Sequence, residues 1–369
     1  MTELDIKSVL DRVEAKMQVV TKRTGKKIPY RTVNGRFDDM SGAGINWWTN
    51  GFWGGTMWQL YNLTGNEMYK ETAVYVEEQL DRTLMDHEGM DHDSGFRWLP
   101  TAVADYKVTG SKKAYNRGRI AADNLAGRFN PAGNFIRAWN DNGDGSRAGW
   151  AIIDCMMNLP LLYWAYDVTK DARYLNIACA HADSTRVNFI REDGSVKHIV
   201  EYDPTTGTYI KNQGGQGYNE ASSWTRGQAW GLYGFTLSYM HTKKEEYLET
   251  AKKIADYFIS CIPENGLIPV DFRQPSDVDY EDGTAAAIAA CGLIELSKIT
   301  GDNSQKEAAL KMLKALIDNR LDLTEGTDYL LTGCSEAYFR DTHNHSMNYA
   351  DYYFIEALLK LQGKELFMW

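Results

Sequence analysis

The sequence predicts an all-α protein, a two-layer (α/α)6 barrel built from six helical hairpins. Five segments share one plan, in which an apolar helix end reaches a threonine, a short polar turn follows and a new helix begins. Periodic apolar patterns at residues 3–20 and 347–361 add one helix at each end of the chain, which makes about twelve helices. The five segments are YNLTGNEMY (61–69), YKVTGSKKAY (106–115), YDVTKDARY (166–174), MHTKKEEY (240–247) and SKITGDNSQ (297–305).

The short turns contain the residues that such hairpins need. A glycine follows the threonine at positions 65, 110 and 301, and glycine suits the left-handed residue that ends a helix. The Asn, Ser or Asp that comes next can cap the following helix. Because the spacing between hairpins varies and the last helix is as apolar and aromatic as the others, a closed ring is favoured over a solenoid. We expect a single domain over residues 1–369.

The longer connections converge on the face opposite the short turns, and there we expect the functional site. The segments 152–164 and 284–295 are apolar on nearly all sides, so the helices that follow the longer connections are predicted to form the inner wall. Loops carried by a rigid scaffold are the usual location of catalytic residues. These connections are residues 36–50, 86–95, 129–147, 190–223, 260–282 and 320–346.

Composition excludes several classes of function. The 369 residues have a formal charge of −10 from scattered acids and no basic patch, which argues against nucleic-acid binding. The N-terminus is predicted to be an amphipathic helix without the apolar stretch of a signal peptide, and no later run is expected to cross a membrane. The five cysteines are far apart and mostly in apolar segments, so we interpret them as reduced and buried, and expect a cytoplasmic protein with no membrane partner.

Asp154 interrupts the apolar run AIIDCMMNLPLLYWAY (151–166), which is predicted to be helical. An ionised carboxylate is costly in such surroundings unless it has partners. One reading is a structural aspartate, paired for example with Asn158 one helical turn further on. The other is a proton carrier, because burial raises the pKa of a carboxyl group toward neutral pH.

The loop MDHDSGF (90–96) concentrates ionisable side chains and supplies a second carboxylate, Asp93. Two acids that face one pocket are the usual equipment for cleaving glycosidic bonds. The same loop could instead cap a helix through Asp93 or Ser94. A metal site formed by Asp91, His92 and Asp93 is disfavoured, since adjacent residues rarely point at one ion.

Aromatic and cationic side chains favour an anionic sugar as the ligand. Arg226 lies at the start of a predicted inner helix with Trp230 one turn later, and both the guanidinium and the helix N-terminus favour a carboxylate. A salt bridge from Arg226 to Asp154 or Glu220 is the alternative. Indole faces stack on sugar rings, although each one can equally be packing. The tryptophans near the predicted loops and helix starts are Trp47, Trp48, Trp53, Trp98, Trp139, Trp150, Trp224 and Trp230.

The chain resembles the unsaturated glucuronyl hydrolases of glycoside hydrolase family 88 over nearly its whole length. The resemblance rests on the stretches WWTNGFW, DHDSGF, RAWNDNGD, AIIDCMMNLPLLYWA, SSWTRGQAWGLYGF, GTAAAIAACGLIE and ADYYFIEALLKL, in this order. It implies an (α/α)6 barrel, no metal and no organic cofactor. It also implies a substrate that polysaccharide lyases leave with a 4,5-unsaturated uronic acid at the non-reducing end, from glycosaminoglycans or similar polymers, and hydration of the C4=C5 enol ether.

The resemblance also implies roles for individual residues. Asp154 matches the general acid and base that protonates C4 while water adds to C5, and Asp93 matches the second essential aspartate; the reverse assignment stays open. Gln216 and Arg226 match positions suited to the substrate carboxylate. The other matching pocket positions are Trp48, His92, Trp139, His198, Trp224 and Trp230.

Two departures limit what the resemblance transfers. Gly215 stands where relatives often have a histidine, so a contact to the leaving sugar is expected to be missing. The segment CSEAYFRDTHNHSMNYADYY (334–353) lacks the Ser-x-Lys arrangement of members that favour sulfated substrates. Arg340, His343 and His345 either supply positive charge there or belong to a solvated loop, and we favour the loop.

Three alternatives remain. Related unsaturated rhamnogalacturonyl (pectin-type) hydrolases share the architecture. A sugar epimerase with an α/α barrel would be expected to use paired histidines on inner helices, whereas the seven histidines here lie mostly in predicted loops. A non-catalytic carbohydrate-binding protein would keep the aromatic residues but has no reason to bury Asp154.

Overall fold

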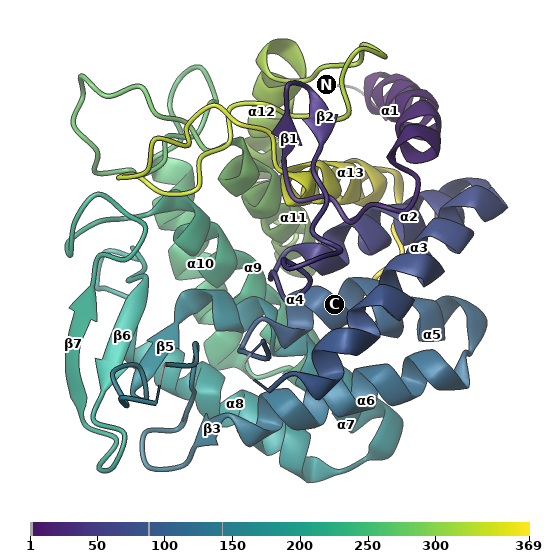
Figure 1. The fold of residues 1–369 in the computed structure, drawn as a ribbon. Helices are drawn as coiled ribbons and strands as arrows, with labels where there is room; N and C mark the ends of the chain where they lie inside the picture. Colours follow the sequence, from purple (N-terminus) through teal and green to yellow (C-terminus); the bar gives the residue numbers. More distant parts are fainter. Residues whose placement is uncertain (1–2, 88, 142) are drawn as a thin grey trace.

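The computed structural model describes residues 3–87, 89–141 and 143–369, and its helices form the two layers of an α/α barrel (Figure 1). The inner helices are buried except near the ends that lead into the short turns, and each contacts the next until α13 contacts α2 and closes the ring. A π-helical turn, η2 (Leu99–Val103), joins α4 and α5 into one helical segment. The inner helices are α2 (Asn50–Thr64), α4 (Ser94–Trp98), α5 (Ala104–Thr109), α7 (Pro160–Thr169), α9 (Thr225–Thr242), α11 (Gly283–Thr300) and α13 (Asn348–Gln362).

The outer helices bury only one face. In α10, for example, Tyr247, Ala251, Ile254 and Phe258 are buried at helical spacing, while the intervening lysines and acids face solvent. The outer helices are α1 (Glu3–Thr24), α3 (Glu67–Leu80) with the 3-10 turn η1 (Asp81–Met85), α6 (Lys112–Gly127), α8 (Ala172–Asn188), α10 (Glu245–Ser260) and α12 (Asn303–Asn319).

The predicted hairpin turns are confirmed. The inner helices α2, α5 and α11 end in a glycine at positive φ, as at Gly65 with φ 69°. In the other two turns Lys170 and Lys243 take the left-handed conformation instead. In four of these turns the side chain of the next residue accepts a hydrogen bond from a backbone N–H of the following helix. These acceptors are Asn66, Ser111, Asp171 and Asp302.

Short strands, which the sequence analysis did not predict, lie in or next to the long connections. Two antiparallel pairs are β1 (Thr32–Val33) with β2 (Arg36–Phe37), and β3 (Phe129–Asn130) with β4 (Phe135–Ile136). A three-stranded antiparallel sheet has the order β5 (Trp150–Ile152), β6 (Ile199–Tyr202) and β7 (Tyr209–Gln213), with Ala151 opposite Val200. This sheet brings two long connections together at one side of the barrel opening (Figure 1).

The segment around Asp154 is not the single helix that its apolar run predicted. Residues 150–152 form β5, the next five form a 3-10 helix, η3 (Ile153–Met157), and the α-helix begins only at Pro160. Proline lacks a backbone N–H and fits the first position of a helix, so α7 begins at this point. Asp154 therefore lies at a strand-to-helix corner rather than within an inner helix.

The structure also bears on two expectations from composition, those on membrane-spanning runs and on the cysteines. Helix α11 is long and apolar enough to cross a membrane, contrary to the expectation that no run reaches that length. However, 83% of it is buried inside the barrel, as in the core helix of a globular protein. All five cysteines are free thiols; Cys155, Cys291 and Cys334 are buried, and Cys179 and Cys261 are partly buried.

Candidate active site

A cavity of about 970 Å³ is lined by residues of the long connections and of the helix ends next to them. This volume is within the range of small-ligand sites. All the predicted site residues except Trp230 line it: Trp48, His92, Asp93, Trp139, Asp154, His198, Gln216, Trp224 and Arg226. The barrel thus brings together side chains that come from positions far apart along the chain.

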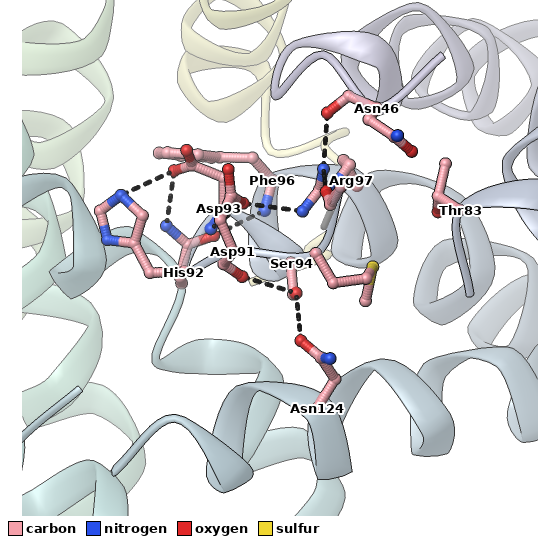
Figure 2. A network of polar contacts seen from close by, with 12 residues as sticks. Asn46, Thr83, Asp91, His92, Asp93, Ser94, Phe96, Arg97 and Asn124 are labelled. Atoms are coloured by element: carbon pink, nitrogen blue, oxygen red, sulfur yellow. Dashed lines mark hydrogen bonds and ion pairs between the residues drawn. The ribbon is translucent and has the colours of Figure 1, made fainter. Parts of the chain in front are cut away.

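The loop that carries Asp93 is fixed by its own charged neighbours (Figure 2). Asp91 Oδ1 accepts hydrogen bonds from the backbone N–H of Asp93 at 3.0 Å and from Nη2 of Arg97 at 2.8 Å. Arg97 is fully buried and donates from Nη1 to two backbone carbonyls, those of Asn46 and Gly89. Asp93 precedes α4 but its side chain makes no capping hydrogen bond, so the capping interpretation of this aspartate is wrong. The buried Arg97 therefore pairs with Asp91 and not with Asp93, and the Asp93 carboxyl group lines the cavity.

The carboxyl group of Asp93 is buried among neutral and acidic neighbours. Its Oδ1 lies 3.4 Å from Nδ2 of Asn158 and 3.5 Å from Nε2 of His92. Only 9% of the side chain is exposed. Burial, followed by the negative charges of Asp91 and Asp154, raises the pKa of Asp93 well above its usual value.

Asp154 faces the cavity from the corner between β5 and α7. Its side chain keeps 17% of its accessible surface, and within the described part of the chain its Oδ1 has no hydrogen-bond partner. Burial raises the pKa of Asp154 to about 7, opposed by the positive charge of Arg226. Asn158 donates to the backbone carbonyl of Asp154 at 3.2 Å, not to its carboxylate, so the structural pairing considered from the sequence is absent. A carboxyl group with such a pKa can both give and take a proton near neutral pH.

His198 is held in one tautomer beside Asp154. Its Nδ1 accepts the backbone N–H of Gln216 at 2.9 Å. Burial, followed by the charge of Arg226, lowers the pKa of His198 to about 3, so the ring is neutral. A neutral imidazole whose Nδ1 is an acceptor carries its proton on Nε2, and this atom lies 3.8 Å from Oδ1 of Asp154.

Gly215 makes this arrangement possible. It has φ +58°, and a Cβ atom at this position would lie 1.9 Å from Nδ1 of His198. A histidine or any other side chain here would displace the ring unless the loop moved. The departure from the family pattern that the sequence showed is therefore coupled to how closely this loop approaches His198.

Arg226 has a buried ion-pair partner that the sequence did not indicate. Its Nη1 forms a close ion pair with Asp282, the residue that caps α11, rather than with Asp154 or Glu220. Nη1 also donates to the carbonyl of Ser335 at 2.7 Å, and Nη2 to the carbonyl of Glu336 at 2.6 Å. Gln216 Nε2 donates to the same Glu336 carbonyl at 2.6 Å. Arg226 and Gln216 thus fix the segment before α13 against the cavity wall, in addition to lining the cavity.

The aromatic residues divide into cavity walls and core. Trp48 and Trp139 are partly exposed at the cavity, and the Arg226 guanidinium lies 4.6 Å from the Trp224 ring centroid. Trp230 is different, because it is 0% exposed and packs against Phe96 with ring centroids 5.0 Å apart. Trp230 is thus a core residue in this structure, not part of the cavity wall as predicted. Trp53 and Trp98 are likewise buried.

Several residues of the site escaped the sequence analysis. Tyr30, Glu336 and Tyr349 line the cavity, and Tyr30 donates a hydrogen bond to Glu336 at 2.9 Å. Their only signal in the sequence is a position in or next to a long connection, which many other residues share.

The segment that precedes α13 is neither wholly solvated nor wholly part of the site. Arg340 lines the cavity, whereas His343 stacks on Tyr280 with ring centroids 3.6 Å apart. His345 pairs with Cys334 through backbone hydrogen bonds. Among the described residues, no three His, Cys, Asp or Glu side chains are arranged to hold a metal ion.

Comparison with known proteins gives one consistent result. Residues 14–367 match the family model described as Glycosyl Hydrolase Family 88. An unsaturated glucuronyl hydrolase from Bacillus sp. (strain GL1) is 36% identical over 331 residues, 85% of this chain and 86% of that protein. An unsaturated chondroitin disaccharide hydrolase from Streptococcus pneumoniae is 35% identical over 85% of this chain and 81% of that protein. A solved structure of a UGL variant with dGlcA-Glc-Rha-Glc superposes with a TM-score of 0.89 at 33% identity, covering 95% of each chain.

Proposed function

The chain belongs to glycoside hydrolase family 88, and from this membership and the geometry of its cavity we propose that it releases the 4,5-unsaturated uronic acid from the non-reducing end of lyase-generated oligosaccharides. The substrate class we propose is of glycosaminoglycan type. The names of the relatives support it, since these are glucuronyl and chondroitin disaccharide hydrolases.

The proposed reaction is a hydration. The Asp154 carboxyl group gives its proton to C4 of the C4=C5 enol ether, and positive charge develops at C5 and the ring oxygen. Water adds to C5 and loses a proton to the Asp154 carboxylate, which restores the acid. The resulting C5 hemiketal opens and frees a hemiacetal at C1, which collapses to the aldehyde and releases the remaining sugar chain.

The position of Asp154 in the cavity supports this mechanism most strongly. Its carboxyl group is buried enough for a pKa of about 7, yet faces a cavity with aromatic walls. Proton transfer to an alkene carbon needs an acid that is still protonated near neutral pH, and burial supplies this property. Asp93 lines the same cavity, and its carboxylate form is suited to accept hydrogen bonds from the ring hydroxyls.

The test uses unsaturated disaccharides and their saturated counterparts. The C4=C5 bond of the uronate absorbs in the ultraviolet, so hydration removes the absorbance. We expect the absorbance to fall with an unsaturated chondroitin or hyaluronan disaccharide, and the saturated disaccharide to remain intact. Cleavage of the saturated sugar would contradict the hydration mechanism. Turnover of unsaturated rhamnogalacturonan disaccharides alone would contradict the substrate class.

A further inference from the structure

Asn158 lies between the two carboxylate-bearing segments and is fully buried. Its Nδ2 is 3.4 Å from Oδ1 of Asp93, 65 positions earlier in the chain, and 3.2 Å from the backbone carbonyl of Asp154. Its Oδ1 accepts the backbone N–H of Phe96 at 2.8 Å. One side chain therefore contacts both the Asp93 carboxylate and the backbone that carries Asp154.

The orientation of this amide is fixed by the backbone N–H of Phe96, which donates to it. A backbone N–H can only donate, so the atom of Asn158 that faces Phe96 has to be the oxygen. The NH2 group then necessarily points toward Asp93 and Asp154. In this position Asn158 can only donate to Asp93.

A glycine allows Asn158 to approach α4 so closely. A Cβ atom at Gly95 would lie 2.5 Å from Cα of Asn158 and 2.6 Å from its Oδ1. The first turn of α4, which follows Asp93 directly, thus packs against the Asn158 backbone with no side chain between them. This contact and the hydrogen bonds of Asn158 together set the spacing between α4 and the segment that carries Asp154.

We propose that Asn158 is a positioning residue, whose amide holds the Asp93 carboxyl group in place relative to Asp154 and donates a hydrogen bond to it. This inference rests on the proposed function only for its kinetic part. The hydrogen bond from Asn158 favours the charged form of Asp93 and so lowers its pKa, against the larger effect of burial. Without this donor, Asp93 would be protonated over a wider pH range and would keep only the 3.5 Å contact from its Oδ1 to Nε2 of His92.

The experiment compares Asn158→Leu with a matched variant, Gln59→Met. Gln59 is also a fully buried amide with two backbone partners, the N–H and C=O of Leu366, and it does not line the cavity. Both substitutions remove a buried amide of similar size without adding a titratable group. The wild-type protein and both variants are assayed for absorbance loss of an unsaturated disaccharide and for thermal unfolding between pH 4.5 and 8.5.

We expect Asn158→Leu to lower kcat by about 100-fold with KM changed less than about threefold, and to shift the acid limb of the kcat profile to higher pH. Gln59→Met is expected to lower the melting temperature and leave kcat and the pH profile unchanged. A wild-type pH profile in Asn158→Leu, or a loss confined to KM, would overturn the proposal. Should Asn158→Leu not fold, Asn158→Ser is expected to show the same shift with a smaller loss of kcat, and an unshifted profile would overturn the proposal equally.

The thermal measurement separates this inference from the proposed function. If the wild type turns over none of the disaccharides, the proposed function fails, while the unfolding data still test Asn158. Because Asp93 becomes harder to ionise without the amide, the melting temperature of Asn158→Leu relative to wild type should fall further as pH rises from 4.5 to 8.5. A difference that is the same at every pH, as expected for Gln59→Met, would overturn the inference.

Discussion

Nε2 of His198 lies 3.8 Å from Oδ1 of Asp154, and neither atom has a hydrogen-bond partner among the described residues. The backbone N–H of Gln216 occupies the other ring nitrogen of His198, so the proton of the neutral ring faces Asp154. Both residues line the cavity, although these two atoms are themselves buried. The proposed reaction requires a water within reach of the Asp154 carboxyl group, whose side chain keeps 17% of its surface accessible.

Replacement of the proposed acid is expected to slow the proton-transfer step without weakening substrate binding. We expect Asp154→Asn to lower kcat by about 10²- to 10⁴-fold, because the amide cannot give or take the proton, with KM nearly unchanged. Absorbance loss measures the rate and isothermal titration calorimetry measures the affinity. A variant that keeps more than about a tenth of the wild-type kcat would exclude Asp154 as the proton donor. Loss of binding together with kcat would point to a structural role instead.

The activity depends on the protonated form of Asp154. Because burial raises the pKa of this carboxyl group to about 7, the group is protonated below that pH and loses its proton above it. The kcat/KM profile should therefore have an alkaline limb with a midpoint near pH 7. Initial rates between pH 5 and 9 measure the profile, and an activity that keeps rising to pH 9 would refute this assignment.

The same burial costs stability at high pH. The pKa of Asp154 rises from 3.8 to about 7 on folding. The free energy of unfolding is therefore unaffected by this group below pH 4, falls as pH rises from 4 to 7, and carries the full loss above pH 7. The rise corresponds to ~4 kcal/mol. Asp154→Asn removes this penalty, so the variant should unfold at a higher temperature than wild type at pH 8, with a much smaller difference at pH 4.5. Scanning calorimetry at both pH values measures this, and equal differences at the two pH values would contradict it.

Two tryptophans separate packing from substrate contact. Trp230 is fully buried against Phe96, so Trp230→Ala should destabilise the protein by about 3–5 kcal/mol. The conservative Trp230→Phe should retain the wild-type KM. Trp48 lines the cavity, and Trp48→Ala is expected to raise KM by about tenfold, in line with the loss of one stacking contact. Urea unfolding and steady-state kinetics measure the two effects, and a raised KM in Trp230→Phe would restore Trp230 to the binding site.

Local patterns predicted the barrel because each hairpin carries its own signals. A threonine, a left-handed residue and a capping side chain lie next to one another at Thr64, Gly65 and Asn66, and the structure uses all three. The short strands were not predictable from such patterns. Strand β5 has three residues, and its pairing depends on β6, which lies 47 or more positions further along the chain.

The site was predictable as a set of residues but not as a set of contacts. Asp93, Asp154 and Arg226 are recognisable because charges at the edges of apolar helices are unusual. Their partners come from other helices and loops, which become neighbours only when the ring closes. Arg226 pairs with Asp282, 56 positions away, and Asp93 contacts Asn158. Helical spacing placed Trp230 beside Arg226 but did not show that Phe96 covers it.

Incorporation of deuterium at C4 tests most directly whether the enzyme transfers a proton to this carbon. The wild-type enzyme is incubated with an unsaturated chondroitin disaccharide in D2O, and the first ¹H NMR spectra are recorded before the product exchanges with solvent. Because the proposed acid takes its proton from solvent, the released uronic acid should carry one deuterium at C4, and Asp154→Asn should form this product at least about 100-fold more slowly. Release of the sugar with the C4=C5 bond intact and no deuterium at C4 would contradict the account.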